Sequence, residues 1–333
     1  MKKVLSLIIA LAMVFALVAC GEKQPSNDGN TDGDKPARGN VIMTFGTADT
    51  GGSMYPAGAA VSQVWTNNVQ GVKCNTQTST GSFQNCQDVS TGEVDVAVAT
   101  SDVVLNAYNG TGKFADIGKL DNLRVIGAVY TSVLSGVTLK SSGLTYIHDL
   151  LGKRVAVGPA ASATENATLA AFAAMDITKD NTSLENLGLG DGADSVGDGI
   201  LDAAFGFAGL PIGGQLNLAA TKEIQVLDMT QEEIDKVLAG NAAYIQTKIP
   251  AGTYTGQDND ANTFGVKCLI IVTADMDADL VYDLCKAMNE HTEELAAGNA
   301  LLKDMTDPSF LCTQMPIPLH DGAQKYYSEQ GLI

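Results

Sequence analysis

The sequence predicts an α/β protein of two lobes, each built on a mainly parallel β-sheet. Short apolar runs alternate with Gly/Ser/Thr-rich loops and helical patterns, which is the element order of a parallel α/β sheet. This rhythm stops near residue 140 and restarts at Lys153, as it would at the start of a second lobe. About 290 residues follow the N-terminal segments described next, which suits two hydrophobic cores better than one.

The first nineteen residues have the pattern of a secretory signal. Lys2 and Lys3 precede residues 4–19, a run with a single polar member. This run is shorter than the ~20 apolar residues that a membrane-spanning helix needs, and small residues before Cys20 match a lipoprotein cleavage site. We therefore expect residues 1–19 to be a signal peptide that is removed, and Cys20 to carry a lipid. The alternative is an uncleaved signal anchor with an incidental cysteine.

Residues 20–40 are expected to form a disordered tether. Gly, Asn, Asp, Lys, Pro and Ser predominate there and no large apolar residue is present, so the segment cannot repay the entropy of ordering. The folded domain then comprises lobe I, residues 41–135 and 265–333, and lobe II, residues 136–264.

In the first predicted lobe, strands are followed directly by polar loops and helices. Pro56 suits the first turn of the first helix, and Ser53 is placed to cap it. The expected strands are residues 41–45, 72–78, 94–99 and 123–130, and the expected helices are residues 55–67, 82–91 and a segment after 100–102. A further strand is expected at 136–140, where lobe II begins.

The second predicted lobe repeats the pattern after a short helix at residues 147–151. Ser162 and Glu165 have the spacing of a capping box at the start of its first long helix. The expected elements are a strand at 153–158, a helix at 160–176, a Gly/Asp-rich loop at 188–199 and a strand at 203–208. A returning strand at 265–272 and C-terminal helices at 277–297 and 322–329 then complete lobe I.

Charge argues against nucleic acid as a partner. The formal net charge is −18, and removal of the signal leaves 18 basic and 38 acidic residues, or −20. The only arginines are Arg38, Arg124 and Arg154, and phosphate binding needs clustered basic residues.

Five cysteines remain after Cys20, so at least one thiol has no partner within a monomer. Cys74 and Cys86 are close enough in sequence to form a local disulfide, but buried free thiols are favoured. No CxxC or His/Cys cluster indicates a metal site.

Polar loops are expected at the carboxyl edge of both sheets. Three lie in lobe I, at residues 47–53, 80–82 and 100–102, and one lies in lobe II, at 158–165. Open α/β sheets bind ligands at this edge, and helix N-termini attract anions without arginine. Ordinary helix capping explains any single loop. Four loops divided between two lobes favour a ligand cleft.

Catalytic and cofactor motifs are weak or missing in the sequence. No GxxxxGK[ST] or GxSxG pattern occurs, and the glycines at 188–192 follow no convincing strand. His148, His291 and His320 are isolated, and Asp191 and Asp194 lack the terminal Glu of an EF-hand. We therefore expect no catalytic residues, no metal and no cofactor.

Several motifs nevertheless point to one family. They include Gly46-Thr47 with Thr50-Gly51-Gly52 and Tyr55-Pro56, Thr80-Gly81-Ser82 with Asn85, Ser101-Asp102, Gly152-Lys153-Arg154-Val155, Ile249-Pro250-Ala251-Gly252-Thr253-Tyr254, and Pro318-Leu319-His320. On these residues the chain, from about Phe45 to Gly331, resembles the TAXI family, the solute-binding receptors of tripartite TRAP transporters.

The resemblance implies the type II periplasmic-binding-protein fold, in which two α/β lobes are joined by crossing strands and the ligand lies in the interlobe cleft. It also implies an extracytoplasmic monomer, held to the membrane here by lipid on Cys20, that captures a small carboxylate such as glutamate or a 2-oxoacid. The lobes close by a hinge motion, and the closed receptor delivers its ligand to a TRAP permease.

The expected ligand-binding residues mostly end strands or open helices in both lobes, whereas Arg124 and Arg154 fall within strand patterns. They are Thr50, Gly51, Gly52, Ser53, Tyr55, Thr80, Ser82, Ser101, Tyr130, Ser162, Thr164, Phe207, Gly209 and Tyr254. The family usually has glycine at Ala48 and Ala163, and commonly tyrosine and proline at Met54 and Thr255. Because alanine disfavours positive φ, these loops are expected to differ in backbone angles or amide contacts.

Two other functions remain open at this stage. A binding lipoprotein of an ABC importer, or a sensor, shares the fold and differs in its membrane partner. An enzyme on the same two-lobed architecture is disfavoured because the sequence offers no constellation of nucleophile, base or metal ligands.

Overall fold

The computed structural model describes residues 39–48, 50 and 52–333. The predicted signal peptide, Cys20 and nearly all of the predicted tether lie outside this range. The described residues belong to one compact unit built on a single ten-stranded sheet. Within that part of the chain, no helix is both long enough and apolar enough to cross a membrane.

The sheet is parallel at its two ends and antiparallel in its middle. Its order is β2-β1-β3-β10-β4-β7-β5-β6, with β8 paired to β4 and β9 to β10. β1 pairs in parallel with β2 and β3, and β5 with β6 and β7, whereas β10 is antiparallel to β3 and β4. The strands are β1 (Val41–Gly46), β2 (Val72–Gln77), β3 (Val96–Thr100), β4 (Leu123–Leu139), β5 (Arg154–Ala156), β6 (Ser183–Glu185), β7 (Ala203–Ala208), β8 (Ile224–Val226), β9 (Ile245–Ile249) and β10 (Ala261–Thr273).

Helices connect these strands and cover the sheet. The α-helices are α1 (Met54–Asn68), α2 (Ser82–Thr91), α3 (Ser101–Asn109), α4 (Ala163–Ala174), α5 (Leu189–Gly197), α6 (Gly213–Thr221), α7 (Gln231–Gly240), α8 (Ala278–Glu290), α9 (Thr292–Gly298), α10 (Pro308–Cys312) and α11 (Asp321–Glu329). Short 3-10 helices are η1 (Gly112–Phe114), η2 (Lys140–Ser142), η3 (Ile147–Leu150) and η4 (Ala300–Thr306).

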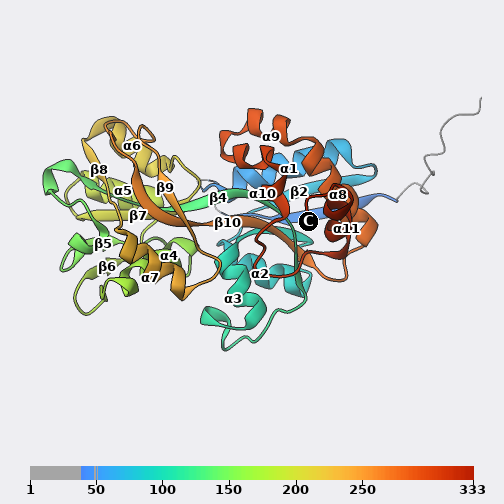
Figure 1. Cartoon of the computed structure of the whole chain (residues 1–333), viewed down its shortest axis with the longest axis horizontal. Coiled ribbons are helices and arrows are strands. Elements are labelled where there is room, and N and C mark those ends of the chain that lie inside the picture. The colour runs from blue at the N-terminus through green and yellow to red at the C-terminus, as the bar shows by residue number, and fades with distance from the viewer. Residues whose placement is uncertain (1–38, 49, 51) are drawn as a thin grey trace, which may run out of the picture. The chain divides into compact units, whose positions relative to one another are not determined.

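The hydrophobic core is divided into two pairs of clusters. One pair draws its buried residues from 43–130 and 268–327, and we call this part lobe I. The other pair draws them from 133–266, and we call this part lobe II. The chain passes from lobe I to lobe II along β4 and returns along β10, which run together between the two groups of helices in Figure 1.

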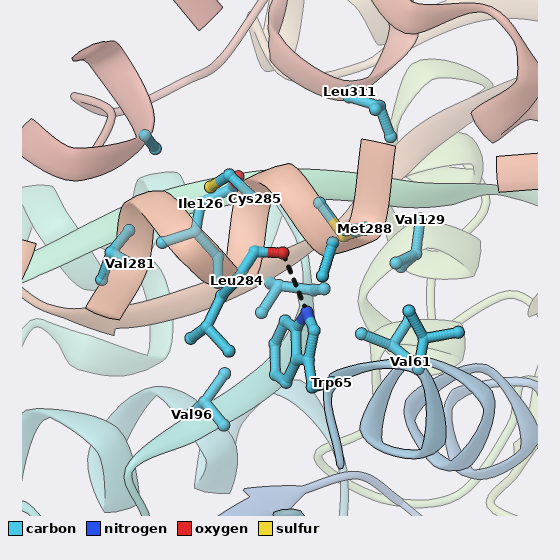
Figure 2. Packing of buried hydrophobic residues seen from close by; sticks show 14 of the residues in the cluster. Val61, Trp65, Val96, Ile126, Val129, Val281, Leu284, Cys285, Met288 and Leu311 are labelled. Carbon is cyan, nitrogen blue, oxygen red and sulfur yellow. Dashed lines mark hydrogen bonds between the residues drawn. The ribbon is translucent and has the colours of Figure 1, made fainter. Parts of the chain in front are cut away.

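Trp65 anchors α1 in the core of lobe I. Its side chain is fully buried, its ring stacks on that of Phe45 with centroids 5.4 Å apart, and its indole Nε1 donates to the carbonyl of Leu284 on α8 at 3.1 Å. Figure 2 shows the indole lying among side chains of α1, α8 and the sheet. Because α1 is fixed in this way, its N-terminus is held at a defined place beside the end of β1.

The crossing strands differ from the prediction of two separate strands at residues 123–130 and 136–140. β4 is continuous through both segments. It stays extended because its partner changes along its length, from β10 in lobe I to β7 and β8 in lobe II. Local sequence does not reveal such a change of partners.

Two helical predictions also need correction. Residues 188–199 were expected to form a loop, but α5 occupies most of the segment, because Ala193 and Val196 pack into a lobe II core and offset the poor helix propensity of glycine. The expected helix at 277–297 is two helices, α8 and α9, separated at His291. The elements β6, β8, β9, α6, α7 and α10 were not predicted.

The cysteines of the described domain are all free and buried. The favoured interpretation of buried thiols is thus confirmed, and the alternative of a Cys74–Cys86 disulfide is not realised. Burial raises the pKa of the Cys74 thiol to about 11.

Candidate functional site

The candidate site lies where the carboxyl edges of the two parallel sheet ends face each other. In lobe I, the strands β1, β2 and β3 are parallel and lead into α1, α2 and α3. In lobe II, β5 leads into α4, and β7 leads into the loop before α6. The N-termini of these helices therefore gather along the junction of the lobes, where their unpaired N–H groups favour an anion.

A buried asparagine holds the lobe I loops in place. Asn85 is fully buried, and its amide Nδ2 lies 2.6 Å from the carbonyl oxygens of both Thr47 and Val98, the latter in β3. The Ser79 hydroxyl shares its one proton between Asn85 Oδ1 at 2.6 Å and the Thr47 carbonyl oxygen at 2.8 Å. Sequence motifs pointed to Asn85 but assigned it no role, because its partners lie as far as 38 residues away.

Ser53 reaches across the junction instead of capping its own helix. It occupies the N-cap position of α1 without a side-chain capping bond, contrary to the sequence prediction. Its hydroxyl accepts a hydrogen bond from the backbone N–H of Gly209 in lobe II at 3.2 Å. A hydroxyl that accepts one bond still has a proton to donate, so this contact is compatible with an anionic ligand.

Ser82 and Ser101 open the next two helices of lobe I. Ser82 is buried, and its hydroxyl accepts from the backbone N–H of Thr100 at 3.1 Å, which ties the start of α2 to the end of β3. The Ser101 hydroxyl donates to the carbonyl of Ala243 in lobe II at 3.4 Å.

At the start of α4, the capping box is only half formed. Ser162 accepts from the backbone N–H of Glu165 at 3.1 Å, as its spacing predicted. The Glu165 carboxylate, however, accepts from the N–H of Ala161 at 2.7 Å. Ala161 itself adopts a left-handed φ of 61°, whereas Ala163 does not. The expected difference from the family in this loop stays a prediction.

The remaining predicted residues of lobe II and the crossing strands are buried. The Thr164 hydroxyl accepts from the backbone N–H of Phe207 at 3.2 Å. The Tyr254 hydroxyl accepts from the N–H of Ile212 at 3.1 Å and donates to Gln215 at 2.8 Å, which supports the loop after β7 from behind. Tyr130 lies on β4 and is almost fully buried.

The loops before α1 and α2 contribute more accessible residues. Thr50 and Thr80 are exposed, and they border a hollow of about 430 Å³ that also involves Thr78, Ser79 and Gln84. Gly52 and Tyr55 are half-buried at the start of α1. Gly51 lies outside the described residues. Which of these groups contact a ligand stays a prediction.

Further contacts join the lobes beside this edge. Lys113 of lobe I forms an ion pair with Glu165 of lobe II at 2.9 Å. Asn166 on α4 donates to the carboxylate of Asp102 on α3 at 2.9 Å. Only about 20 Å³ of space remains between the lobes in the region lined by Phe114 and Ser162. The lobes are therefore in direct contact along this side of the junction.

Both arginines that the structure describes form their hydrogen bonds away from this site. Arg154, at the amino end of β5, forms a bidentate ion pair with Asp202, with nitrogen–oxygen distances of 3.0 and 3.2 Å. Arg124 donates to the carbonyls of Asp121 and Leu123. Both lie in strands, as predicted, and neither contributes to the described carboxyl-edge loops. No group of three or more potential metal ligands occurs in the part of the chain that the structure describes.

Comparison with known proteins gives one family match. A sequence model of the NMT1-like family matches residues 45–331, which is most of the chain.

Solved structures of similar fold have low sequence identity. A structure from work on glutathione import via GshT and the cystine ABC importer TcyBC of Streptococcus mutans is 13% identical and has a TM-score of 0.50, covering 80% of this chain and 99% of that one. A protein from Archaeoglobus fulgidus is 12% identical with a TM-score of 0.48, covering 88% and 98%. The alkanesulfonate-binding protein SsuA from Xanthomonas axonopodis pv. citri bound to MOPS is 15% identical with a TM-score of 0.46, covering 88% and 84%.

Proposed function

Because the chain belongs to the NMT1-like family, a periplasmic solute-binding family, we propose that it captures a small carboxylate between its lobes and presents it to a membrane permease. The family consists of extracytoplasmic substrate-binding proteins rather than enzymes. Solute binding by a two-lobed α/β protein follows from the family. The ligand class, the type of permease and the lipid anchor are our proposals.

The observation that carries the ligand class is the set of donors at the lobe junction. The starts of α1, α2, α3 and α4 bring backbone N–H groups to facing edges, together with the hydroxyls of Ser53, Ser82 and Ser162, which act as acceptors in their protein contacts and keep a proton to donate. Helix N-termini hold carboxylates by hydrogen bonds and by the positive end of the dipole. The described arginines of the folded domain, Arg124 and Arg154, lie elsewhere, so we propose that amides and hydroxyls hold the anion.

Closure of the lobes would make binding selective. Ser53 and Gly209 belong to different lobes and touch only when the lobes are together. A ligand that contacts both lobes binds the closed state more tightly than the open one, and so shifts the population toward closure. Such a closed state is what a permease would recognise.

The ligand can be tested directly. Native mass spectrometry of the freshly purified protein should reveal a bound small carboxylate, whose affinity is then measured by calorimetry on ligand-stripped protein. A hydrogen bond to a charged ligand is worth about 1.5–3 kcal/mol, so Ser53→Ala, Ser82→Ala and Ser162→Ala should each bind roughly tenfold or more weakly. Ser183→Ala is the control, because Ser183 is exposed on β6, away from this edge.

The opposite result would overturn the proposed site. If the three serine variants bind as tightly as the parent, while Arg124→Ala or Arg154→Ala abolishes binding without unfolding the protein, then arginine holds the carboxylate. Both arginine variants need a thermal melt, because Arg154 also anchors the start of β5 to Asp202.

We further propose that the mature protein begins at a lipidated Cys20. The motivation is the apolar run ending in small residues before this cysteine. Mass spectrometry of the membrane fraction should show a diacylated N-terminal Cys20, and Cys20→Ala should abolish both lipid attachment and cleavage at this site. An unmodified Cys20 in the native protein would contradict the assignment.

For the membrane partner, we propose a TRAP permease on the strength of the motif resemblance to TAXI receptors. The family match and the fold agree equally well with an ABC importer. Uptake of the identified ligand in cells lacking either transporter type distinguishes the two. Loss of uptake only without an ABC permease would exclude the TRAP assignment.

A further inference from the structure

One buried carboxylate lies at the contact between the lobes. Asp102, in the first turn of α3, is fully buried. Its Oδ2 accepts hydrogen bonds from Asn166 Nδ2 on α4 at 2.9 Å and from the Tyr244 hydroxyl before β9 at 3.3 Å. Both donors come from lobe II. Asp102 therefore belongs to lobe I, but both of its side-chain hydrogen-bond donors belong to lobe II.

Among the described residues, no cation stabilises the ionised form of this carboxylate. Its second oxygen, Oδ1, is buried without a hydrogen-bond partner. The other titratable groups near it are Cys86 on α2, Cys268 on β10 and Tyr244, and all three are neutral at pH 7. Lys113, which lines the same interlobe space as Asn166, is paired with Glu165. A buried carboxylate that has no cation beside it is costly to keep ionised.

We propose that Asp102 is a closure latch that takes up a proton when lobe II closes over it. In the open state, Asn166 and Tyr244 move away and water reaches the carboxylate, which then ionises like an ordinary aspartate. In the closed state, the Asp102 carboxyl is shielded from water. Its protonated form is then favoured, and its Oδ2 still accepts hydrogen bonds from Asn166 and Tyr244. Proton uptake and closure are then linked, and each favours the other.

The direction of the pH effect follows from the two states. Burial raises the pKa of Asp102 in the closed structure, although polar contacts with Thr100, Val103, Asn166 and Tyr244 partly offset this rise. Lower pH therefore favours closure, with at most a tenfold change in the closed-to-open ratio per pH unit for one proton. The Lys113–Glu165 pair opposes this only at lower pH, because its contacts lower the pKa of Glu165 below its usual range.

The test measures closure without any added ligand. Spin labels on Asn109→Cys in α3 and Leu169→Cys in α4 report the distance between the two helices, since both positions are exposed and the native cysteines of the described domain are buried. Pulsed electron paramagnetic resonance between pH 8 and pH 5 should show a short-distance population that grows as the pH falls. This inference rests on the closing motion of the proposed function and not on the identity of the ligand.

Three variants separate a latch from a merely structural residue. Asp102→Asn imitates the neutral acid, so its distance distribution should be independent of pH and resemble that of the parent at low pH. Asp102→Ala lacks the acceptor for both lobe II donors and should be more open at every pH. Asp198→Asn, on an exposed acid in lobe II, should retain the parental response.

The proposal is overturned if the parental distances do not change between pH 8 and pH 5. It is equally overturned if Asp102→Asn responds to pH as the parent does. Because no ligand is present, a failure to bind carboxylates would leave a positive result intact, and a negative result would leave carboxylate binding untouched.

Discussion

A methyl group added at Gly209 should obstruct closure of the lobes without unfolding either of them. Gly209 follows β7 in lobe II, where its N–H meets Ser53 of lobe I. An alanine Cβ at this position would overlap Cδ1 of Leu301, and it would lie 3.2 Å from Leu301 Cγ and 3.4 Å from Tyr130 Cδ2. Leu301 belongs to η4 and packs on the lobe I core. The obstruction therefore arises mainly when the lobes are together.

The expected loss of ligand affinity follows from the overlap between the added Cβ and Leu301. The end of a leucine side chain can rotate, so the cost is that of an overpacked contact, about 1–3 kcal/mol. Since the cost falls on the closed state alone, it appears as weaker ligand binding, about 5- to 150-fold in Kd at 1.4 kcal/mol per tenfold. Gly209 does not have a positive φ, so alanine brings no backbone strain of its own.

Calorimetry with the co-purified ligand checks this prediction, beside thermal melts of the ligand-free protein. Gly213→Ala is a matched control, because a Cβ at Gly213 would meet no atom within 4 Å. Adding Leu301→Ala to Gly209→Ala should recover part of the affinity. The reasoning is refuted if Gly209→Ala binds as tightly as the parent, or if it is weak but gains nothing from the second substitution.

The remaining predictions concern stability. Trp65→Ala should lower the free energy of unfolding by about 3–5 kcal/mol in urea titrations, because it leaves a cavity in the packing shown in Figure 2 and removes the indole hydrogen bond to Leu284; a loss under 1 kcal/mol would contradict the packing. His320 caps α11 by accepting from Gly322 N–H at 3.1 Å, and burial lowers its pKa. The contribution of this cap to the free energy of unfolding is complete above pH ~6.5 and is lost as the pH falls through the lowered pKa. The free energy of unfolding should therefore fall less with acid in His320→Asn, because asparagine still caps the helix but does not titrate. Equal pH profiles of the two proteins would refute this. The cysteines of the mature domain should react with a thiol reagent only after denaturation, with no disulfide found; rapid reaction of the native protein would contradict their burial.

Local signals in the chain predicted the elements that depend on local contacts. The strand at 203–208 coincides with β7, and the helix at 55–67 is within one residue of α1 at each end. Ser162 caps α4 as expected, since donor and acceptor are three residues apart. Where the local pattern was ambiguous, as at 188–199, packing against the lobe II core decided for helix α5.

Local sequence signals could not predict contacts between residues that are distant in the chain. Ser53 has every local feature of a helix cap, yet its partner is Gly209, 156 residues away. Asp102 was noted as part of a motif, but its partners Asn166 and Tyr244 are 64 and 142 residues distant. Nothing in a single sequence distinguishes these partners from the many other polar residues of the chain.

The sequence by itself determined the class of fold, the order of most strands and helices, the polar loops at the carboxyl edges and the separation of the arginines from those loops. All of these follow from hydrophobic period and turn chemistry within a few residues. Only the tertiary structure decided that β4 runs unbroken between the lobes, that Ser53 meets Gly209, and that Asp102 is closed off from water. These features depend on how one lobe packs against the other, and burial and hydrogen bonding at that contact are properties of the assembled surfaces rather than of any segment.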